Sequence, residues 1–275
     1  MGKRERTRHL NGAQRAIVLA AFAYLALILV LPLGAMAARA LAGGPGALLT
    51  ALTEPEALHG LLLTLFVAAI CVVTNGVFGV AGALVLSRQR FLGRRVLDAL
   101  VDLPLAVSPV MTGLAFLLVF GRGGWLGPTL DLMDVKVTFA VPGLVLATLF
   151  VTFPFTLREV AYVLEDLGTD EEQAATTLGG SPWQTFWLVT LPNIRFGLGY
   201  GIVLTLARAL GEFGAVLVVG GAISGRTQTA TTFIYNALEE RQEPAAYSMA
   251  LVLAVISVAL LVAIEWLKRR RDREQ

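Results

Sequence analysis

Residues 57–87 read ALHGLLLTLFVAAICVVTNGVFGVAGALVLS and contain no Asp, Glu, Lys or Arg. A membrane-spanning helix needs about 20 predominantly apolar residues, so this run is long enough to cross a bilayer. The whole chain of 275 residues agrees, because 56% of its residues are hydrophobic and only 15% are charged. Soluble proteins carry about 25% charged residues on average. The sequence therefore predicts an all-α, polytopic membrane protein and excludes a soluble enzyme.

Six segments predict six transmembrane helices. Five of them are runs without charge, at residues 16–38, 57–87, 103–121, 137–157 and 244–264. The sixth segment, 196–225, is long enough but includes Arg208 and Glu212. The first run follows a basic N-terminus, as the apolar core of a signal peptide does. Its 23 residues exceed the usual core of about 7–15 residues, so we expect it to be retained as a helix.

The distribution of Lys and Arg predicts the orientation, because cytoplasmic loops carry an excess of these residues. Sixteen of the 22 lie in the two tails and in the loops after the second and fourth spans. We therefore expect both termini in the cytoplasm, with basic tails at residues 1–15 and 268–275, a first helix at 16–38 and a five-helix core domain at 57–267. Arg208 lies within a span, and the opposite side carries Arg39, Arg122, Lys136, Arg226 and Arg241.

The segment between the fourth and fifth spans carries helix signals of its own. Thr169 followed by Glu172 matches the capping-box pattern, and Gly179 favours the end of that helix. Ser181 and Gln184 match the pattern again at the start of a second helix. The hairpin is either a plain connection between two spans or a surface on which another protein docks. Its candidate surface residues are Asp170, Glu171, Glu172, Gln173, Ala174, Ala175, Leu178 and Gly179.

The same hairpin resembles the EAA loop of ABC importer permeases. That motif has Glu-Ala-Ala, three residues, Gly, nine residues and then Ile-x-Leu-Pro, and the spacing here matches throughout. Gln173 replaces the motif Glu and Val189 replaces the Ile. The resemblance implies the ABC type I importer permease fold, a core permease domain at 57–267 and a cytoplasmic coupling hairpin at 168–192. It also implies that the hairpin docks on a separate ATPase.

Further segments are similar to sulfate/thiosulfate permeases, with the W-type subunit nearest and molybdate permeases as looser relatives. These segments lie at residues 102–109, 140–155, 168–172 and 207–216. The resemblance implies an importer of sulfate or thiosulfate in the bacterial inner membrane, with molybdate or tungstate as alternative cargo. The implied partners are a cytoplasmic dimer of ABC ATPases, a homologous T-type permease, an extracytoplasmic sulfate-binding protein and the lipid bilayer, and no nucleic acid.

Cofactors and catalytic residues are not expected in this chain. It lacks the Gly-x-x-x-x-Gly-Lys-Ser/Thr phosphate loop, so ATP and magnesium are expected on the partner ATPase. The lone Cys71 lies in an apolar run, and His9 and His59 are isolated. This pattern predicts neither a disulfide framework nor a metal site.

Arg208 and Glu212 are spaced for an ion pair between residues i and i+4 of a helix. Because a charge at membrane depth costs at least about 2.5–3.5 kcal/mol, the pair predicts either a translocation path or gate, or an internal brace. Gly211 and Gly214 permit close packing or local opening beside Glu212, and Asp102 is a candidate third partner. Only one cation lies within a span, so we expect oxyanion selectivity mainly in the external receptor.

A rival interpretation is a secondary transporter driven by an ion gradient. Such a protein uses intramembrane carboxylates and broken helices in two repeats. Glu212 alone supports it, and the sequence shows no clear internal repeat.

Overall fold

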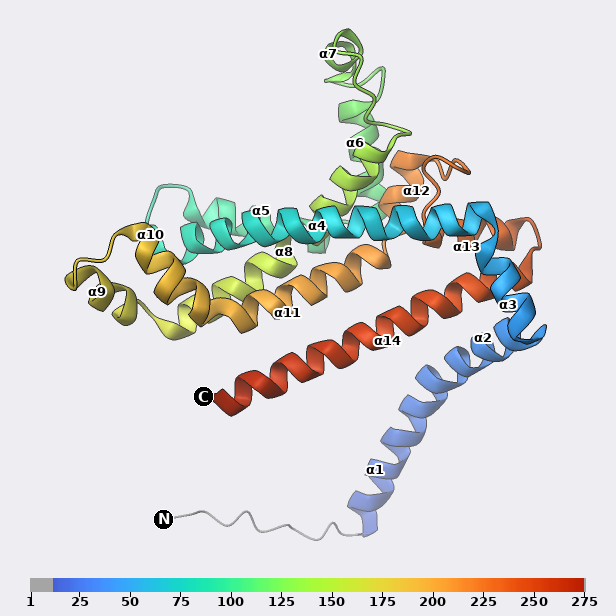
Figure 1. Ribbon diagram of the computed structural model, residues 1–275, viewed down its shortest axis with the longest axis horizontal. Coiled ribbons are helices and arrows are strands. Elements are labelled where there is room, and N and C mark those ends of the chain that lie inside the picture. The colour runs from blue at the N-terminus through green and yellow to red at the C-terminus, as the bar shows by residue number, and fades with distance from the viewer. Residues whose placement is uncertain (1–11, 275) are drawn as a thin grey trace.

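The computed structural model describes residues 12–274, and every regular element in that range is helical (Figure 1). Three long helices, α4, α8 and α11, pack side by side as the core of a bundle, and α14 flanks them. The helices are α1 (Gly12–Leu25), η1 (Ala26–Val30), α2 (Leu31–Leu41), α3 (Gly44–Thr53), α4 (Pro55–Arg88), α5 (Arg94–Ala106), α6 (Pro109–Phe120), α7 (Gly127–Leu132), α8 (Val141–Leu167), α9 (Asp170–Thr177), α10 (Pro182–Thr185), η2 (Phe186–Thr190), α11 (Leu191–Leu210), α12 (Gly214–Gly220), α13 (Ala230–Glu239) and α14 (Glu243–Glu274).

Small residues let the three core helices pack closely. A Cβ on Gly79 of α4 would lie 3.1 Å from the Cβ of Thr156 of α8, and one on Gly201 of α11 would lie 2.8 Å from its Cα. Thr156 therefore sits between two glycines from different helices. Asn75 Nδ2 of α4 also donates a hydrogen bond of 2.8 Å to Thr152 Oγ1 of α8. This bond satisfies buried polar groups that would be costly to leave unpaired inside a membrane.

Five helices are long and apolar enough to cross a membrane, and a sixth span is counted only if α5 and α6 are taken together. The prediction of a continuous span at 103–121 is wrong, because α5 and α6 meet at 112°. Pro109 begins α6, and Ser108 before it is extended, with φ −61° and ψ 138°. A residue that precedes proline is driven out of the helical region, which explains the break.

The prediction of a single span at 196–225 is also wrong. The helix that crosses there begins earlier, at Pro182, and ends at Leu210. A new helix, α12, begins at Gly214, where a Cβ would lie 3.1 Å from the Cβ of Pro109. The two helix breaks therefore pack against each other.

The segments beyond these two breaks pack on each other. α12 packs on α6, and Figure 1 shows α6 and α7 projecting from the long helices. A Cβ on Gly113 of α6 would lie 2.7 Å from the Cβ of Val218 of α12, which shows how closely the two helices approach. We call α6, α7, α12 and the loops at 121–126, 133–140 and 221–229 the side arm.

The first predicted span is confirmed as an apolar helical segment, Ala16–Leu41. Its α1 portion points away from the bundle, while α2 contacts α14 (Figure 1). None of the most apolar part of this segment is buried within the chain. Lipid or another protein must therefore cover these apolar side chains.

Candidate coupling site

The predicted hairpin forms at one end of the bundle, where α8 ends and α11 begins. Gly179 closes α9 with a φ of +87°, a conformation that glycine adopts without strain. Gly180 N then donates to Ala175 O at 3.0 Å. The second capping box is confirmed, because Ser181 N donates to Gln184 Oε1 at 2.9 Å and Gln184 N donates to Ser181 Oγ at 3.3 Å.

The prediction of a capping box at Thr169 and Glu172 is wrong. The side chain of Thr169 accepts no hydrogen bond from the start of α9. Instead Gln173 Nε2 donates to Thr169 Oγ1 at 2.7 Å. Glu172, the expected partner in the box, turns toward α4, because a stronger, charged partner is available there.

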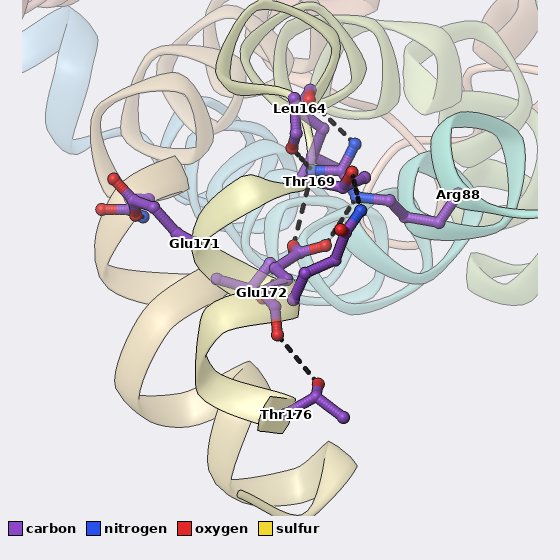
Figure 2. Close-up of polar contacts among 10 residues, drawn as sticks. Arg88, Leu164, Thr169, Glu171, Glu172 and Thr176 are labelled. Carbon is purple, nitrogen blue, oxygen red and sulfur yellow. Dashed lines mark hydrogen bonds and ion pairs between the residues drawn. The ribbon is translucent and has the colours of Figure 1, made fainter. Parts of the chain in front are cut away.

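That partner is Arg88, the last residue of α4. Arg88 Nε lies 2.8 Å from Glu172 Oε2, and Thr190 Oγ1 donates to Glu172 Oε1 at 2.9 Å. We call Arg88, Glu172 and Thr190 the Arg88 clasp; Figure 2 shows Arg88 and Glu172 in contact. The Arg88 and Glu172 side chains are only 15% and 22% exposed, so solvent screens their attraction only in part.

Arg88 also closes the end of α8. Its Nη1 donates to Leu164 O at 2.9 Å and its Nη2 donates to Gly168 O at 2.6 Å (Figure 2). The last carbonyls of a helix lack partners within the helix, and a cation near them is favourable. A single guanidinium therefore joins α4, the end of α8 and the coupling hairpin.

The predicted docking residues divide into two that bond to the bundle and others that stay accessible. Glu171 accepts a hydrogen bond from Asn193 Nδ2 of α11, so Glu171 and Glu172 both bond to the bundle. Ala175 is partly covered, and Leu178 is 89% exposed. The exposed residues that make neither of these bonds are called the open face of α9: Asp170, Gln173, Ala174, Leu178 and Gly179.

The clasp was not predicted from the sequence. Arg88 counted only among the cations that predict the orientation of the chain in the membrane, and its partner Glu172 lies 84 residues away. The available signal was its place as the first cation after a long apolar helix, where a cation can bind helix ends.

Asp102 does not join Arg208 and Glu212, so that grouping is wrong. Arg158 of α8 binds Asp102 through two nitrogens, Nε to Oδ1 at 2.8 Å and Nη2 to Oδ2 at 2.7 Å. Its Nη1 donates to Asp98 Oδ1 at 2.6 Å. Asp98 and Asp102 are one helical turn apart on α5, and α5 packs on α8. This second ion-pair cluster therefore holds α5 to the bundle.

The predicted pair between Arg208 and Glu212 forms, with Arg208 Nη1 2.8 Å from Glu212 Oε2. Glu212 lies in the break after Gly211 and not within a continuous helix. Its Oε1 accepts a hydrogen bond of 2.9 Å from Ala215 N, which caps the start of α12, and Thr231 Oγ1 donates to its carbonyl at 2.6 Å. The Glu212 side chain is only 1% exposed, so its contacts brace the break.

Long apolar helices, two helices broken beside one another and a helical hairpin fixed to one end define the membrane component of a transport system. Residues 75–273 match the model of the binding-protein-dependent transport system inner membrane components, and the chain belongs to this family. Its members are permease subunits of ABC importers, and membership decides against the rival class of transporters driven by ion gradients.

Several curated relatives share most of their length with the chain. It is 45% identical to the sulfate transport system permease protein CysW of Synechococcus elongatus, over 91% of this chain and 88% of the relative. It is 41% identical to CysW of Escherichia coli K12, over 91% and 86%. The sulfate transport system permease protein CysT of the same strain is 38% identical, over 91% and 90%.

A solved structure supports the fold. The chain is similar to a chain in the crystal structure of a bacterial alginate ABC transporter in complex with an alginate pentasaccharide-bound periplasmic protein. The TM-score is 0.76 over 93% of both chains, at 16% sequence identity. At this identity the likeness concerns the fold alone, and it agrees with an all-α permease.

Proposed function

We propose that this permease carries sulfate or thiosulfate and is driven by a separate ATPase that docks on the 168–192 hairpin. The cargo is proposed from the relatives, whose names include sulfate transport. The observation that carries the coupling is the Arg88 clasp, because it fixes the hairpin to the membrane helices through partly buried, charged hydrogen bonds. A loop that only connects two helices would not require these charged contacts to the bundle.

The docking surface in this proposal is the open face of α9. Small side chains at Ala174 and Gly179 allow another backbone to approach, and the exposed Leu178 offers an apolar anchor. Gln173 points along α9 to Thr169, so it stabilises the hairpin in place of the motif carboxylate. Glu171 and Glu172 lie outside this surface and act by holding α9 to the bundle.

Movement of the hairpin then reaches all three core helices. Glu172 transmits this movement to α4 through its contact with Arg88, and Arg88 transmits it to the end of α8. The bond between Glu171 and Asn193 passes it to α11. An ATPase that binds one state of the permease more tightly than another can thereby shift the bundle between the two states.

The remaining partners follow from the same proposal. A homologous T-type permease completes the translocation path, and relatives of both types match this chain. An extracytoplasmic sulfate-binding protein delivers the cargo, and ATP and magnesium bind to the ATPase dimer. Both termini lie in the cytoplasm, as the excess of cations on the hairpin side favours.

Leu178→Asp tests the docking surface in the complex of both permeases, ATPase and binding protein. The new charge would be desolvated in the interface, so the ATPase should no longer co-purify. Leu132→Asp is the matched control, because Leu132 of α7 is also 89% exposed but lies far from the hairpin along the chain. If Leu178→Asp retains the ATPase and its stimulation by receptor, the ATPase does not dock here.

A further inference from the structure

The side arm contains a cavity of about 470 Å³ whose charged residues are mostly cationic. It lies between the end of α6, α7 and the loops at 133–139 and 221–226. The loop at 133–139 runs into the start of α8, whereas the coupling hairpin follows its end. The 27 residues of α8 span about 40 Å. The cavity therefore lies on the extracytoplasmic side in the proposed orientation.

Three cations, Arg122, Lys136 and Arg226, line the cavity together with one carboxylate, Asp131. All four are exposed, and within residues 12–274 none of the three cations forms an ion pair. This side of the chain carries few cations, and three of its five gather at this one cavity. The lining therefore carries an excess of two positive charges.

Hydrogen bonds hold the loops that form the walls of the cavity, whereas its charged side chains are exposed. Phe139 N donates to Val219 O at 2.8 Å, which joins the loop that carries Lys136 to the end of α12. Thr227 is buried, and its Oγ1 donates to Gly220 O at 2.6 Å and accepts from Ile223 N at 3.1 Å. These bonds set the loop that carries Arg226 against the same helix.

The backbone in these loops is also held in uncommon conformations. Asp134, Phe139 and Ala222 have φ values of 51°, 55° and 48°. Residues other than glycine rarely adopt positive φ, and the surrounding structure must offset the cost of this conformation. Such strain is concentrated at functional sites.

We propose that this cavity is a transient binding site for a tetrahedral divalent oxyanion, with sulfate as the type. The excess of two positive charges matches the charge of the anion, and each guanidinium can donate two parallel hydrogen bonds to it. This inference rests on the proposed function and adds to it a site in the permease itself. Selectivity still resides in the receptor, because exposed cations attract any oxyanion of this charge.

Weak binding suits this position in the transport cycle. A site on a path must attract the ion and also release it, and hydrated, exposed cations provide attraction without a deep energy minimum. Clefts lined by one sign of charge raise the local concentration of the opposite ion. The cavity would thus hold a partly hydrated anion near the path after the receptor releases it.

The test places a cysteine at Thr138, a cavity residue that is partly exposed, in the complete complex of permeases and ATPase without receptor. The native Cys71 is fully buried, so the unsubstituted complex measures background labelling. Sulfate at millimolar concentration should slow labelling of Thr138→Cys by a charged methanethiosulfonate reagent. An anionic reagent should also react about tenfold less with Thr138→Cys once Arg122, Lys136 and Arg226 are all changed to Gln, as expected for local charge steering.

Arg39→Gln is the matched control, because Arg39 is an exposed cation on the same side that does not line the cavity. Arg39→Gln should leave unchanged both the protection of Thr138→Cys by sulfate and its rate of labelling by the anionic reagent. The inference is overturned if sulfate gives no protection in a complex that retains its ATPase. It is equally overturned if only the receptor, free of sulfate, protects the cysteine, since the cavity is then a docking surface for receptor carboxylates. Loss of the ATPase from the unsubstituted complex would instead contradict the proposed function.

Discussion

Glu172→Gln removes one charge from the Arg88 clasp and changes almost no volume. Arg88 keeps its bonds to the carbonyls of Leu164 and Gly168, so the end of α8 stays closed. The loss is the charged bond of 2.8 Å to Arg88 and part of the bond from Thr190. Hydrogen bonds to charged groups contribute about 1.5–3 kcal/mol, and the Glu172 side chain is 22% exposed.

A loss of about 2 kcal/mol lowers the ratio of clasped to unclasped hairpin about 30-fold. Because Glu172 faces the bundle and not the open face of α9, the ATPase should still bind. The expected result is ATP hydrolysis with less transport, since a hairpin that moves alone does not carry α4 with it. Sulfate uptake per ATP hydrolysed, measured in proteoliposomes with receptor, reports this ratio directly.

Glu165→Gln is the control for that experiment. Glu165 is an exposed carboxylate near the end of α8, and within the described chain it forms no ion pair. Its loss should leave uptake per ATP unchanged. Two results would contradict this role of the Arg88 clasp. One is a Glu172→Gln complex with the same uptake per ATP as the unsubstituted complex, and the other is a Glu172→Gln complex that no longer co-purifies with the ATPase.

Three further substitutions test the packing around the helix breaks and α5. Gly214→Val places a branched side chain where even a Cβ would lie 3.1 Å from Pro109 Cβ. The free energy of unfolding should fall by about 1–3 kcal/mol, measured by thermal melting in detergent. Unchanged melting would contradict the close contact. Glu212→Ala leaves Arg208 without its partner and should alter receptor-stimulated ATPase activity. Because the Arg208 side chain is 31% exposed, the loss of stability should be smaller than that of a fully buried pair, about 3–5 kcal/mol. Activity and melting like those of the unsubstituted complex would exclude a bracing role. Asp102→Asn should lower the free energy of unfolding by less than about 1 kcal/mol, because Asp102 is 50% exposed and Asp98 still pairs with Arg158. A large fall in melting temperature would show that the bidentate contact contributes more than this.

Local patterns were sufficient for the long apolar helices and for the turn of the hairpin. The run at 57–87 is sufficient to predict a membrane-spanning helix, because such a helix mainly requires enough consecutive apolar residues. The turn at Gly179 follows from a conformation that glycine adopts without strain, and the cap at Ser181 depends on residues only three apart. In these cases the sequence contains both partners of the interaction within a few residues.

The packing of the helix breaks and two of the ion-pair clusters depended on contacts between distant residues. The break before Pro109 has a local cause in the proline itself, which a search for charge-free runs overlooks. That α12 packs there could not be read locally, because Gly214 and Pro109 meet only in the folded bundle. In the same way, Arg158 and not Arg208 binds Asp102, since α5 packs along α8. Arg88 finds Glu172 across 84 residues, a pairing that no local spacing encodes.

Cross-linking from Leu178 shows whether the ATPase contacts the end of α9. A cysteine in place of this exposed residue at the end of α9, in a complex that still transports sulfate, should form a short cross-link to the ATPase, while the matched Leu132→Cys should form none. A transporting complex in which Leu178→Cys never cross-links to the ATPase, or sulfate uptake by the permeases with no ATPase present, would contradict coupling through this hairpin.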